Sequence, residues 1–409
     1  MLLITSHNTA NSFIQNFLKI NQRNDSKLEL SSMTQKFQTR FADSYPHLPI
    51  LLFTQNLSLT GNTSKLILLA NGFFNSRDWE GIGAPHKTST QKMTELYCPF
   101  FSNRCDITID FNRLSEADAV VYHMYNDIDK TLVTGKRHPK QRFVFALWES
   151  PANSRNLGSY GRFFNWTMTY RSDSHILTSY YSQTAYFHKS NPYYQLLLKE
   201  NSTHQLNLQT KKVDHRPSDE VLQKKKLGTA AALISNCGGS SQRLQFIDKL
   251  KRYIDVKVYG TCGEGCPSNM NCRQFIAENY FFILSFENSL CLEYTTEKFF
   301  DSLQYPVVPV VRGQTNYSYF IPSSGYIDTN EFSNMSSLAR YLNETRYNKK
   351  KYLSYFSWKK DYVWGLHKFM SPFCDLCLRL HRDSKPNIID DIHDWWFNGT
   401  CEQQVRIPA

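Results

Sequence analysis

Short apolar runs alternate with polar, helix-compatible segments along most of the chain. In the first half, these runs are rich in β-branched and aromatic residues and are bounded by turn-forming segments, which is typical of buried strands. The expected strands are 65–71, 106–110, 117–123 and 142–148. Because helix-compatible segments separate them, the pattern predicts an α/β domain.

A second and more regular alternation begins after residue 228. We expect strands at 229–235, 256–259, 280–286 and 307–311, with helices at 240–253, 271–278 and 296–303. Strand and helix in turn predict a parallel sheet with right-handed crossovers, hence a Rossmann-like domain. Residues 336–342 and 350–362 are then expected to be helical.

The chain length and the polar segments suggest where the domains divide. A chain of 409 residues exceeds what one hydrophobic core usually supports. The polar segment 191–226 contains Pro217 and ends in a lysine run, as an interdomain linker would. We therefore expect a polar stem or tail (1–45), an N-terminal Rossmann-like domain (46–210), a C-terminal Rossmann-like domain (211–365) and a Cys-rich C-terminal segment (366–409).

The formal net charge of +11 raises the question of a polyanionic partner. The basic residues are nevertheless scattered, apart from short runs at 224–226 and 349–351, and no nucleic-acid-binding motif occurs. The charge therefore favours a small phosphorylated ligand and disfavours nucleic acid.

Cysteines and glycosylation sequons indicate the cellular compartment. The cysteines are Cys98, Cys105, Cys237, Cys262, Cys266, Cys272, Cys291, Cys374, Cys377 and Cys401. Sequons occur at Asn24, Asn56, Asn62, Asn165, Asn201, Asn316, Asn334, Asn343 and Asn398. Together they point to an oxidising, glycosylating compartment.

Zinc binding is the competing explanation of the cysteines. Cys374 and Cys377 have the spacing of a ligand pair, but no second pair of that kind follows, so disulfides are favoured and no metal site is predicted. The favoured bridges are Cys98 with Cys105, and a pairing among Cys374, Cys377 and Cys401, although spacing alone does not fix connectivity.

A protein of that compartment needs a targeting segment. Residues 1–20 are interrupted by polar side chains and lack the apolar region of a signal peptide. The apolar stretches 48–53 and 66–74 are too short to span a bilayer and are expected to be strands. Either the natural amino terminus lies beyond this sequence or another signal targets the chain, and we prefer the first explanation.

A candidate anion site follows the predicted strand 280–286. That strand is followed by a polar loop, and a helix is expected to begin near Thr296 with Glu297 and Lys298 in its first turn. Ligands of open parallel sheets lie beyond the carboxyl ends of strands, and a helix amino terminus attracts anions. Lys298 is therefore a candidate contact for a diphosphate, while a solvated lysine paired with Glu297 or Glu293 is an equally weighted alternative.

The stretch 286–301, FENSLCLEYTTEKFFD, resembles the donor-binding signature of the α1,3-fucosyltransferases, family ten of the glycosyltransferases. Glu293 stands where that family usually has Asp. The similarity continues through segments between 307 and 358, and a second block comprises 148–153 and 164–174. In total, the resemblance covers about residues 98–401.

This resemblance implies a fold and a set of site residues. The fold is α/β of GT-B type, in which two Rossmann-like domains face a cleft. Glu149, at the end of a predicted buried strand, corresponds to the catalytic base; as a residue judged alone, it would be a cap for the next turn. The donor-binding positions that the motifs carry over are Asn236, Arg243, Asn288, Tyr294, Glu297 and Lys298.

The implied function is inverting transfer of L-fucose from GDP-β-L-fucose to the 3-hydroxyl of GlcNAc in glycoprotein glycans. An N-glycan core is favoured as acceptor, because the C-terminal segment resembles invertebrate members of the family, and a Lewis-type antenna is the alternative. The resemblance implies that no cofactor is required, although a divalent metal such as Mn could stimulate the reaction. The expected location is the Golgi lumen, as a type II membrane protein whose anchor is not visible in this sequence.

Two competing interpretations remain, one from departures of this sequence from the family motifs and one from the predicted Rossmann-like fold. His175 follows Asp173-Ser174 where the family often has Asp-Ser-Asp, which makes a non-catalytic carbohydrate-binding or scaffold relative conceivable. A dehydrogenase is disfavoured, because no Gly-x-Gly-x-x-Gly follows a predicted strand.

Overall fold

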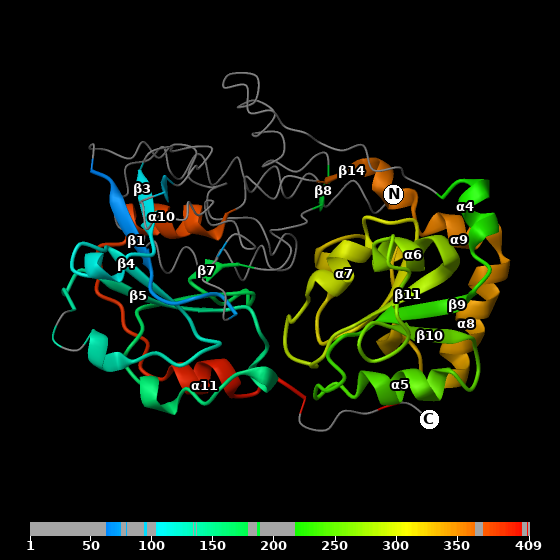
Figure 1. The fold of residues 1–409 in the computed structure, drawn as a ribbon, viewed down its shortest axis with the longest axis horizontal. Coiled ribbons are helices and arrows are strands. Elements are labelled where there is room, and N and C mark those ends of the chain that lie inside the picture. Colours follow the sequence, from blue (N-terminus) through cyan, green and yellow to red (C-terminus); the bar gives the residue numbers. More distant parts are fainter. Residues whose placement is uncertain are drawn as a thin grey trace, which may run out of the picture.

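The chain forms two parallel β-sheets, each covered by helices, which lie side by side in Figure 1. The computed structural model describes residues 63–74, 79, 94–95, 104–133, 135, 137–178, 186–188, 217–364, 371–402 and 407. The expected stem 1–45, the expected strand 48–53, Cys98 and most of the expected linker lie outside the described residues. Both Rossmann-like α/β units predicted from the pattern are confirmed.

The first sheet has seven strands in the order β2-β3-β1-β4-β5-β6-β7. All neighbours pair in parallel except β2, which is antiparallel to β3. The bounds are β1 Lys65–Leu69, β2 Thr94–Glu95, β3 Cys105–Thr108, β4 Ala119–His123, β5 Arg142–Leu147, β6 Trp166–Thr169 and β7 Ile176–Leu177. Every residue of β4 and β5 is buried, as expected for central strands of a sheet covered on both faces.

The Cys-rich C-terminal segment contributes one helix to each of the two layers that cover this first sheet. Helix α10 (Pro372–Arg382) contributes Phe373 and Leu376 to the apolar cluster on one face. Helix α11 (Ile392–Phe397) contributes Ile392 and Trp396 to the cluster on the other face. Figure 1 shows these red and orange helices on opposite sides of the blue and green strands. The end of the chain is therefore an integral part of the first domain's core.

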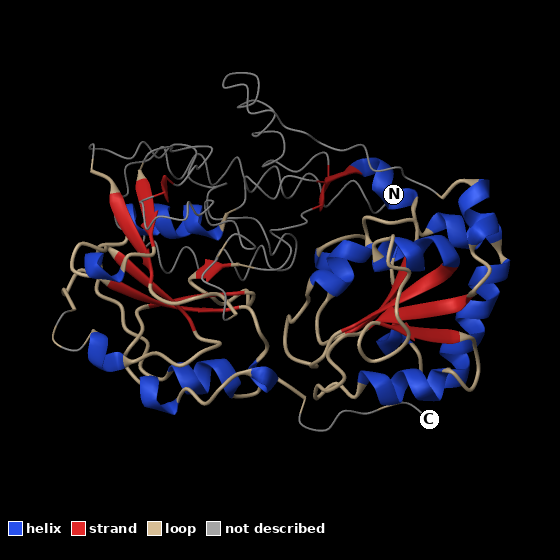
Figure 2. Cartoon of the chain, viewed as in Figure 1, coloured by secondary structure: helices blue, strands red, loops and turns tan. Residues whose placement is uncertain are grey.

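The second sheet is fully parallel, with strand order β10-β9-β11-β12-β13. Its strands are β9 Gly228–Leu233, β10 Val256–Tyr259, β11 Tyr280–Phe286, β12 Val308–Arg312 and β13 Ile327–Asp328. Its helices are α4 Asp219–Lys224, α5 Arg243–Leu250, α6 Cys272–Asn279, α7 Glu297–Ser302, α8 Met335–Tyr347 and α9 Lys349–Ser354. Helices cover both faces of the sheet in Figure 2.

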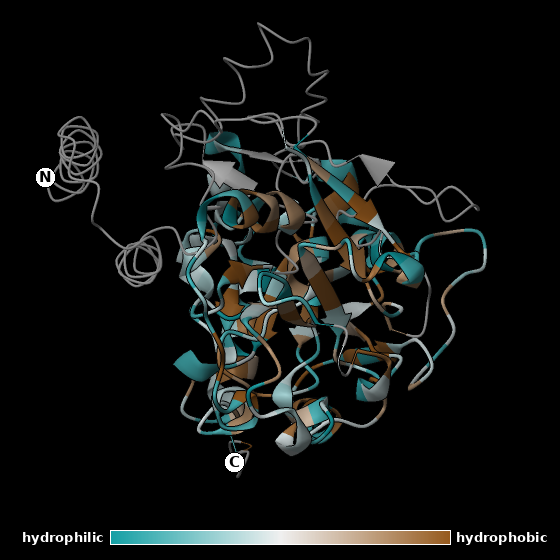
Figure 3. Cartoon of the chain, turned by 90° about the vertical axis from the view of Figure 1, so that its left-hand side faces the viewer, coloured by the Kyte–Doolittle hydropathy of each residue, from teal (hydrophilic) through white to brown (hydrophobic). Residues whose placement is uncertain are grey.

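Alternation along β9 shows how the second core is divided. Ala230 and Ala232 belong to the cluster that includes α5 and α8, whereas Ala231 belongs to the cluster on the face of α6. Successive side chains of a strand point to opposite faces, so this small-residue strand serves two helical layers. Figure 3 shows the hydrophobic residues, in brown, concentrated in the strands at the centre of the view.

Helix ends depart from the sequence prediction where tertiary packing intervenes. The helix expected at 350–362 ends at Ser354, because Tyr355 and Phe356 turn into the core of the second domain. The chain then forms a short 3-10 helix, Ser357–Asp361, and strand β14, Tyr362–Trp364, which pairs antiparallel with β8, Tyr186–His188.

Four disulfides have both partners among the described residues: Cys105–Cys377, Cys237–Cys262, Cys266–Cys272 and Cys291–Cys401. The predicted choice of disulfides over zinc is confirmed, and Cys374 is also disulfide-bonded. Cys105, Cys377 and His381 gather their ligand atoms within 4.8 Å of one another, but the bridge between the two sulfurs already engages them.

The predicted connectivity was wrong. Cys105 is bonded to Cys377 and therefore not to Cys98, and Cys401 is bonded to Cys291 and not to Cys374 or Cys377. The reason is tertiary: α10 packs against β1 and β7 of the first sheet, which brings Cys377 to β3 across 272 residues of sequence. Spacing within a segment carries no information on such packing.

Within the described ranges, every helix is too short or too polar to form a transmembrane span.

We predict that breaking the Cys291–Cys401 bridge destabilises the protein more than breaking a short-range bridge. In the chain-entropy picture, a disulfide that closes a longer loop removes more freedom from the unfolded chain. The separations are 110 residues for Cys291–Cys401 and 6 for the control, Cys266–Cys272. The Cys291→Ala/Cys401→Ala variant should lose about 2 kcal/mol more unfolding free energy than Cys266→Ala/Cys272→Ala. Chemical denaturation under non-reducing conditions measures the difference, and equal losses would contradict the prediction.

Candidate functional site

One loop of the second domain reaches into the first domain. Strand β11 ends at Phe286, and the loop that follows to Thr296, here called the bridging loop (residues 287–296), precedes α7. Cys291 and Tyr294 of this loop are buried in the apolar cluster of the first domain, together with Trp396 of α11. The site therefore lies where the carboxyl end of β11 meets the first domain.

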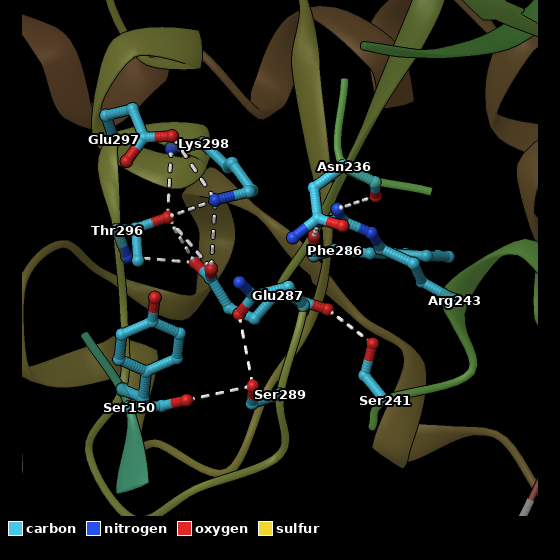
Figure 4. A network of polar contacts seen from close by, with 12 residues as sticks. Ser150, Asn236, Ser241, Arg243, Phe286, Glu287, Ser289, Thr296, Glu297 and Lys298 are labelled. Atoms are coloured by element: carbon cyan, nitrogen blue, oxygen red, sulfur yellow. Dashed lines mark hydrogen bonds and ion pairs between the residues drawn. The ribbon is translucent and has the colours of Figure 1, made fainter. Parts of the chain in front are cut away.

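Hydroxyl groups join the start of the bridging loop to the segment after β5. Ser150 Oγ donates to Ser289 Oγ at 2.9 Å, and Asn153 Nδ2 donates to the same oxygen at 3.1 Å. Both Ser150 and Ser289 are fully buried, and Figure 4 shows this contact between the two domains. Buried hydroxyls that satisfy one another fix the relative position of the two strand ends.

A carboxylate fastens the far end of the bridging loop. The two oxygens of Glu293 accept hydrogen bonds from the backbone N–H and the hydroxyl of Ser172, each at 2.7 Å. Glu293 has a φ of 60°, a left-handed conformation that non-glycine residues seldom adopt. The disulfide from Cys291 to Cys401 holds the middle of the loop. The left-handed backbone at Glu293 is thus maintained by contacts on either side of it.

Glu149 lies at the carboxyl end of β5 and is half-buried. Its Oε1 accepts three hydrogen bonds: from the Ser150 backbone N–H at 2.9 Å, from Tyr294 OH at 2.8 Å and from Asn153 Nδ2 at 3.3 Å. Among the described residues, no hydrogen bond reaches Oε2. The bond from Ser150 is the turn cap that the residue alone suggests, while the bond from Tyr294 comes from the other domain.

Glu287 is the centre of the polar network in Figure 4. It is fully buried, and its carboxylate accepts the backbone N–H and the hydroxyl of Thr296, each at 2.8 Å. Burial raises the pKa of this carboxyl group, because a charge in a dry environment loses its hydration. Sequence analysis did not assign this residue a role; the available signal was an acidic residue directly after an apolar strand.

Lys298 is paired with carboxylates in the described structure. Its Nζ lies 3.5 Å from Glu287 Oε2 and 3.2 Å from Glu297 Oε1, and it donates to Thr296 Oγ1 at 2.9 Å. Burial opposes the charge on Lys298, but the two glutamates outweigh it and raise the pKa. The backbone N–H of Thr296 is engaged by Glu287, so a protein carboxylate already occupies the helix start that sequence analysis expected to attract an anion.

Arg243 lies on the opposite side of the β11 end. It is 3% exposed, and its guanidinium donates to the carbonyl oxygens of Asn236 at 2.7 Å and Phe286 at 3.1 Å. Burial lowers its pKa. Its Nε has no hydrogen-bond partner in the described part of the chain, and a buried unpaired N–H invites an acceptor from a ligand. The side chain of exposed Asn236 accepts the Gly238 N–H at 3.0 Å.

The loop between β9 and α5 is fitted closely to the bridging loop. The backbone N–H of Ser241 donates to the carbonyl oxygen of Asn288 at 3.0 Å, and Ser241 Oγ donates to the carbonyl oxygen of Glu287 at 2.6 Å. Gly239 has a φ of 114°, and a Cβ there would lie 2.4 Å from the Asn288 carbonyl oxygen. Only glycine fits this approach.

His175, which stands where the family often has an aspartate, lies in the interior of the first domain. The His175 ring contacts Thr167 Oγ1 at 3.0 Å and Asn387 Nδ2 at 2.9 Å. Burial lowers its pKa to about 3, which keeps the imidazole neutral at ordinary pH. Asp173 accepts from Arg171 Nε at 2.9 Å and from Trp395 Nε1 at 3.1 Å. These contacts serve packing against the C-terminal segment.

The predicted site residues thus fall into two groups around the bridging loop. Glu149 and Tyr294 meet at the boundary of the domains, while Arg243, Asn288, Glu297 and Lys298 surround the end of β11. Asn236 contributes its backbone oxygen to Arg243. Two Rossmann-like domains, with a half-buried carboxylate at a strand end of one and a buried arginine and a partly buried lysine at a strand end of the other, match the GT-B-type glycosyltransferase arrangement that the sequence resemblance implies.

Comparison with known proteins specifies the family. Residues 222–395 match the C-terminal region of glycosyltransferase family 10 (fucosyltransferase), and residues 62–181 match the fucosyltransferase N-terminal region. Alpha-(1,3)-fucosyltransferase C of Drosophila melanogaster is 34% identical over 84% of this chain and 80% of its own length. Glycoprotein 3-alpha-L-fucosyltransferase A of the same organism is 33% identical over 82% of this chain and 61% of its own length.

A solved alpha1,3-fucosyltransferase with GDP-fucose covers 82% of this chain and 95% of its own, at 16% identity and a TM-score of 0.49. The assignment to a family therefore rests on the sequence matches and not on this structural similarity. The chain belongs to glycosyltransferase family 10, the fucosyltransferases, and its activity is the transfer of fucose in α-1,3 linkage.

We predict that Glu293→Gln loosens the bridging loop. Glutamine has the same size as glutamate, so the substitution leaves the shape of the side chain at this left-handed position unchanged. It removes the negative charge of the carboxylate, whose oxygens accept two short hydrogen bonds from Ser172. Hydrogen bonds to charged acceptors contribute about 1.5–3 kcal/mol, so we expect a loss of about 1–2 kcal/mol in unfolding free energy. Glu344→Gln, at an exposed position of α8, is the control and should change stability by less than about 0.5 kcal/mol. Urea denaturation compares the two, and equal stability would show that the Ser172 contacts are dispensable.

Proposed function

We propose that the chain moves L-fucose from GDP-β-L-fucose to the 3-hydroxyl of GlcNAc in glycoprotein glycans, with inversion at the anomeric carbon. The observation that carries the proposal is the arrangement around Glu149. Three hydrogen bonds converge on Oε1, while Oε2 has no hydrogen bond among the described residues. One oxygen orients the carboxylate and the other is available to accept a proton.

The change of configuration at the anomeric carbon determines which catalytic groups the reaction needs. Converting a β-linked donor into an α-linked product requires one in-line displacement with a base on the acceptor side. The acceptor O3 forms the new bond to the anomeric carbon as the bond to the diphosphate oxygen breaks. Glu149 takes the proton of the 3-hydroxyl, and GDP leaves with the electron pair of the broken bond.

The leaving diphosphate needs positive groups more than a proton donor. The buried Nε of Arg243 has no hydrogen-bond partner among the described residues, and Lys298 keeps its charge because two carboxylates raise its pKa. We assign both to the diphosphate, with Asn236, Asn288 and Glu297 as further donor-site residues. Preorganised cations in a partly buried site stabilise developing charge without reorganisation. In this mechanism no metal is required, and a divalent metal such as Mn would act only as a stimulator.

The acceptor and location are inferred from related proteins. One relative is named for glycoprotein substrates, and others, such as human FUT5, for 4-galactosyl-N-acetylglucosaminide. We favour the GlcNAc of an N-glycan core, with an outer antenna as the alternative. Glycoprotein glycans are modified in the Golgi lumen, and disulfides and glycosylated sequons are typical of proteins of the secretory pathway. Mass spectrometry of products from a panel of defined N-glycans decides between core and antenna.

The non-catalytic carbohydrate-binding or scaffold relative, which the departure at His175 made conceivable, is disfavoured by the family assignment. Release of GDP on mixing the protein with GDP-fucose and a GlcNAc acceptor tests it directly. Acceptor-dependent GDP release supports the enzyme, and its absence supports the binding protein.

We predict that Glu149→Gln abolishes transfer and leaves GDP binding intact. The amide keeps an oxygen for the Ser150 and Tyr294 donors but cannot accept the acceptor's proton, so kcat should fall by about 10²- to 10⁴-fold. Calorimetric titration with GDP should give a dissociation constant within about twofold of the wild-type value, since Arg243 and Lys298, the two cations assigned to the diphosphate, are both retained. Full activity in this variant would remove Glu149 from the role of base.

We predict that Tyr294→Phe lowers kcat by about tenfold, because it removes one hydrogen bond that orients Glu149. The affinity for GDP-fucose separates two roles for Tyr294. A lower kcat with unchanged donor affinity identifies a positioning residue for the base. A weaker donor complex with unchanged kcat identifies the donor contact that family resemblance implies.

We predict that Lys298→Ala weakens GDP binding by about 10- to 100-fold, the contribution of a charge-assisted hydrogen bond. Lys251→Ala is a matched control, because Lys251 follows α5 in the same domain and pairs with Asp248 on the surface. Arg243→Ala should also weaken GDP binding, once thermal unfolding shows that it is folded. Unchanged GDP affinity in both variants would show that the diphosphate lies elsewhere.

A further inference from the structure

A pocket of about 340 Å³ lies in the second domain, apart from the site described above. Its wall comes from a 3-10 turn (Ser323–Gly325), from β13 and the residues after it, and from α8 and α9. It shares no residue with the donor site. In Figure 1, α8 and α9 lie on the side of the second domain that faces away from the first. The volume is sufficient for a small ligand.

Hydroxyl groups dominate the wall of this pocket. Tyr341 OH and Tyr355 OH share one hydrogen bond at 2.6 Å, so the pair retains a proton and lone pairs for a ligand. Ser323 and Ser324 are exposed, and within the described chain no hydrogen bond engages their side chains. Ser354 donates to the Lys351 carbonyl oxygen at 2.7 Å, which leaves its lone pairs as acceptors.

One cation and one carboxylate complete the wall. Lys351 Nζ lies 3.7 Å from the centre of the Tyr341 ring, and Glu331 is exposed at the end of the 3-10 helix Thr329–Glu331, which follows β13. Neither side chain forms a salt bridge with any described residue. Lys351 and Glu331 carry opposite charges, so the wall has no net formal charge. It instead offers donors and acceptors in a small volume beside aromatic rings.

We propose that this pocket is a second saccharide site, which binds a neutral oligosaccharide through its hydroxyl groups. A sugar presents many hydroxyls that both donate and accept, with apolar C–H faces between them, and this matches the serines, tyrosines, lysine and glutamate of the wall. Its role rests on the proposed function: a glycoprotein with several glycans would be held by one glycan here while another enters the cleft. The affinity itself does not depend on catalysis.

Calorimetric titration of the full chain with a desialylated biantennary N-glycan, in saturating GDP, tests the proposal. Ser354→Trp fills the pocket from an exposed position, and Glu331→Gln removes one acceptor charge. Ser333→Trp, at an exposed position just before α8 and outside the pocket, is the matched control. We expect Ser354→Trp to abolish one of two binding events and Glu331→Gln to weaken it by about tenfold, while the control binds as the wild type does.

The opposite outcomes would overturn the inference. Unchanged glycan binding in both Ser354→Trp and Glu331→Gln would exclude the pocket as the site. Displacement of the glycan by inorganic sulfate would identify an anion site instead. Transfer to a small GlcNAc acceptor reports on the cleft alone and should be equal in Ser354→Trp and its control. If neither the wild type nor any variant transfers fucose, but Ser354→Trp loses glycan binding and its control does not, the proposed function fails and the second saccharide site is supported.

Discussion

The hydrogen bond from Tyr294 to Glu149 joins the two domains at the point where chemistry is proposed to occur. Tyr294 belongs to a loop of the second domain, yet it is buried in the core of the first. The orientation of the carboxylate therefore depends on how the bridging loop is seated. That seating rests on the Ser289 hydroxyl, the Glu293 carboxylate and the Cys291–Cys401 disulfide. Contacts on both sides of the loop overdetermine its backbone, which allows a left-handed residue to persist there.

The donor side is organised by charges that compensate one another. Glu287 is buried without access to water, and Thr296 and Lys298 satisfy it. A buried carboxylate of this kind is costly unless it is paired, and it gives Lys298 a defined position in return. The helix start at α7 is consequently occupied by a protein acid before any ligand arrives. A diphosphate at this site would compete with Glu287 and Glu297 for the ammonium group of Lys298. The Nε of Arg243, in contrast, has no hydrogen-bond partner in the part of the chain that the structure describes.

The C-terminal segment explains why the first domain can present its strand ends rigidly. Helices α10 and α11 cover opposite faces of the first sheet, and the chain then crosses to the bridging loop at Cys401. The disulfide of Cys377 with Cys105 holds α10 on the sheet. The last part of the chain thus completes one domain and anchors the loop of the other. Covalent closure across 272 and 110 residues restricts the unfolded chain far more than a local bridge would.

The amino-acid sequence by itself determined the two α/β units, because hydrophobic periodicity is a local property: strands 256–259 and 280–286 occupy the predicted residues. Motif similarity likewise indicated the family, which the comparison with relatives confirmed. Only the tertiary structure decided which cysteines are bonded, since Cys105 and Cys377 meet through packing of α10 on the sheet. It alone revealed the central place of Glu287, and it set Tyr294 against Glu149 across the domain boundary. Such pairings depend on distances between segments remote in sequence, and no local pattern of polar and apolar residues encodes those distances.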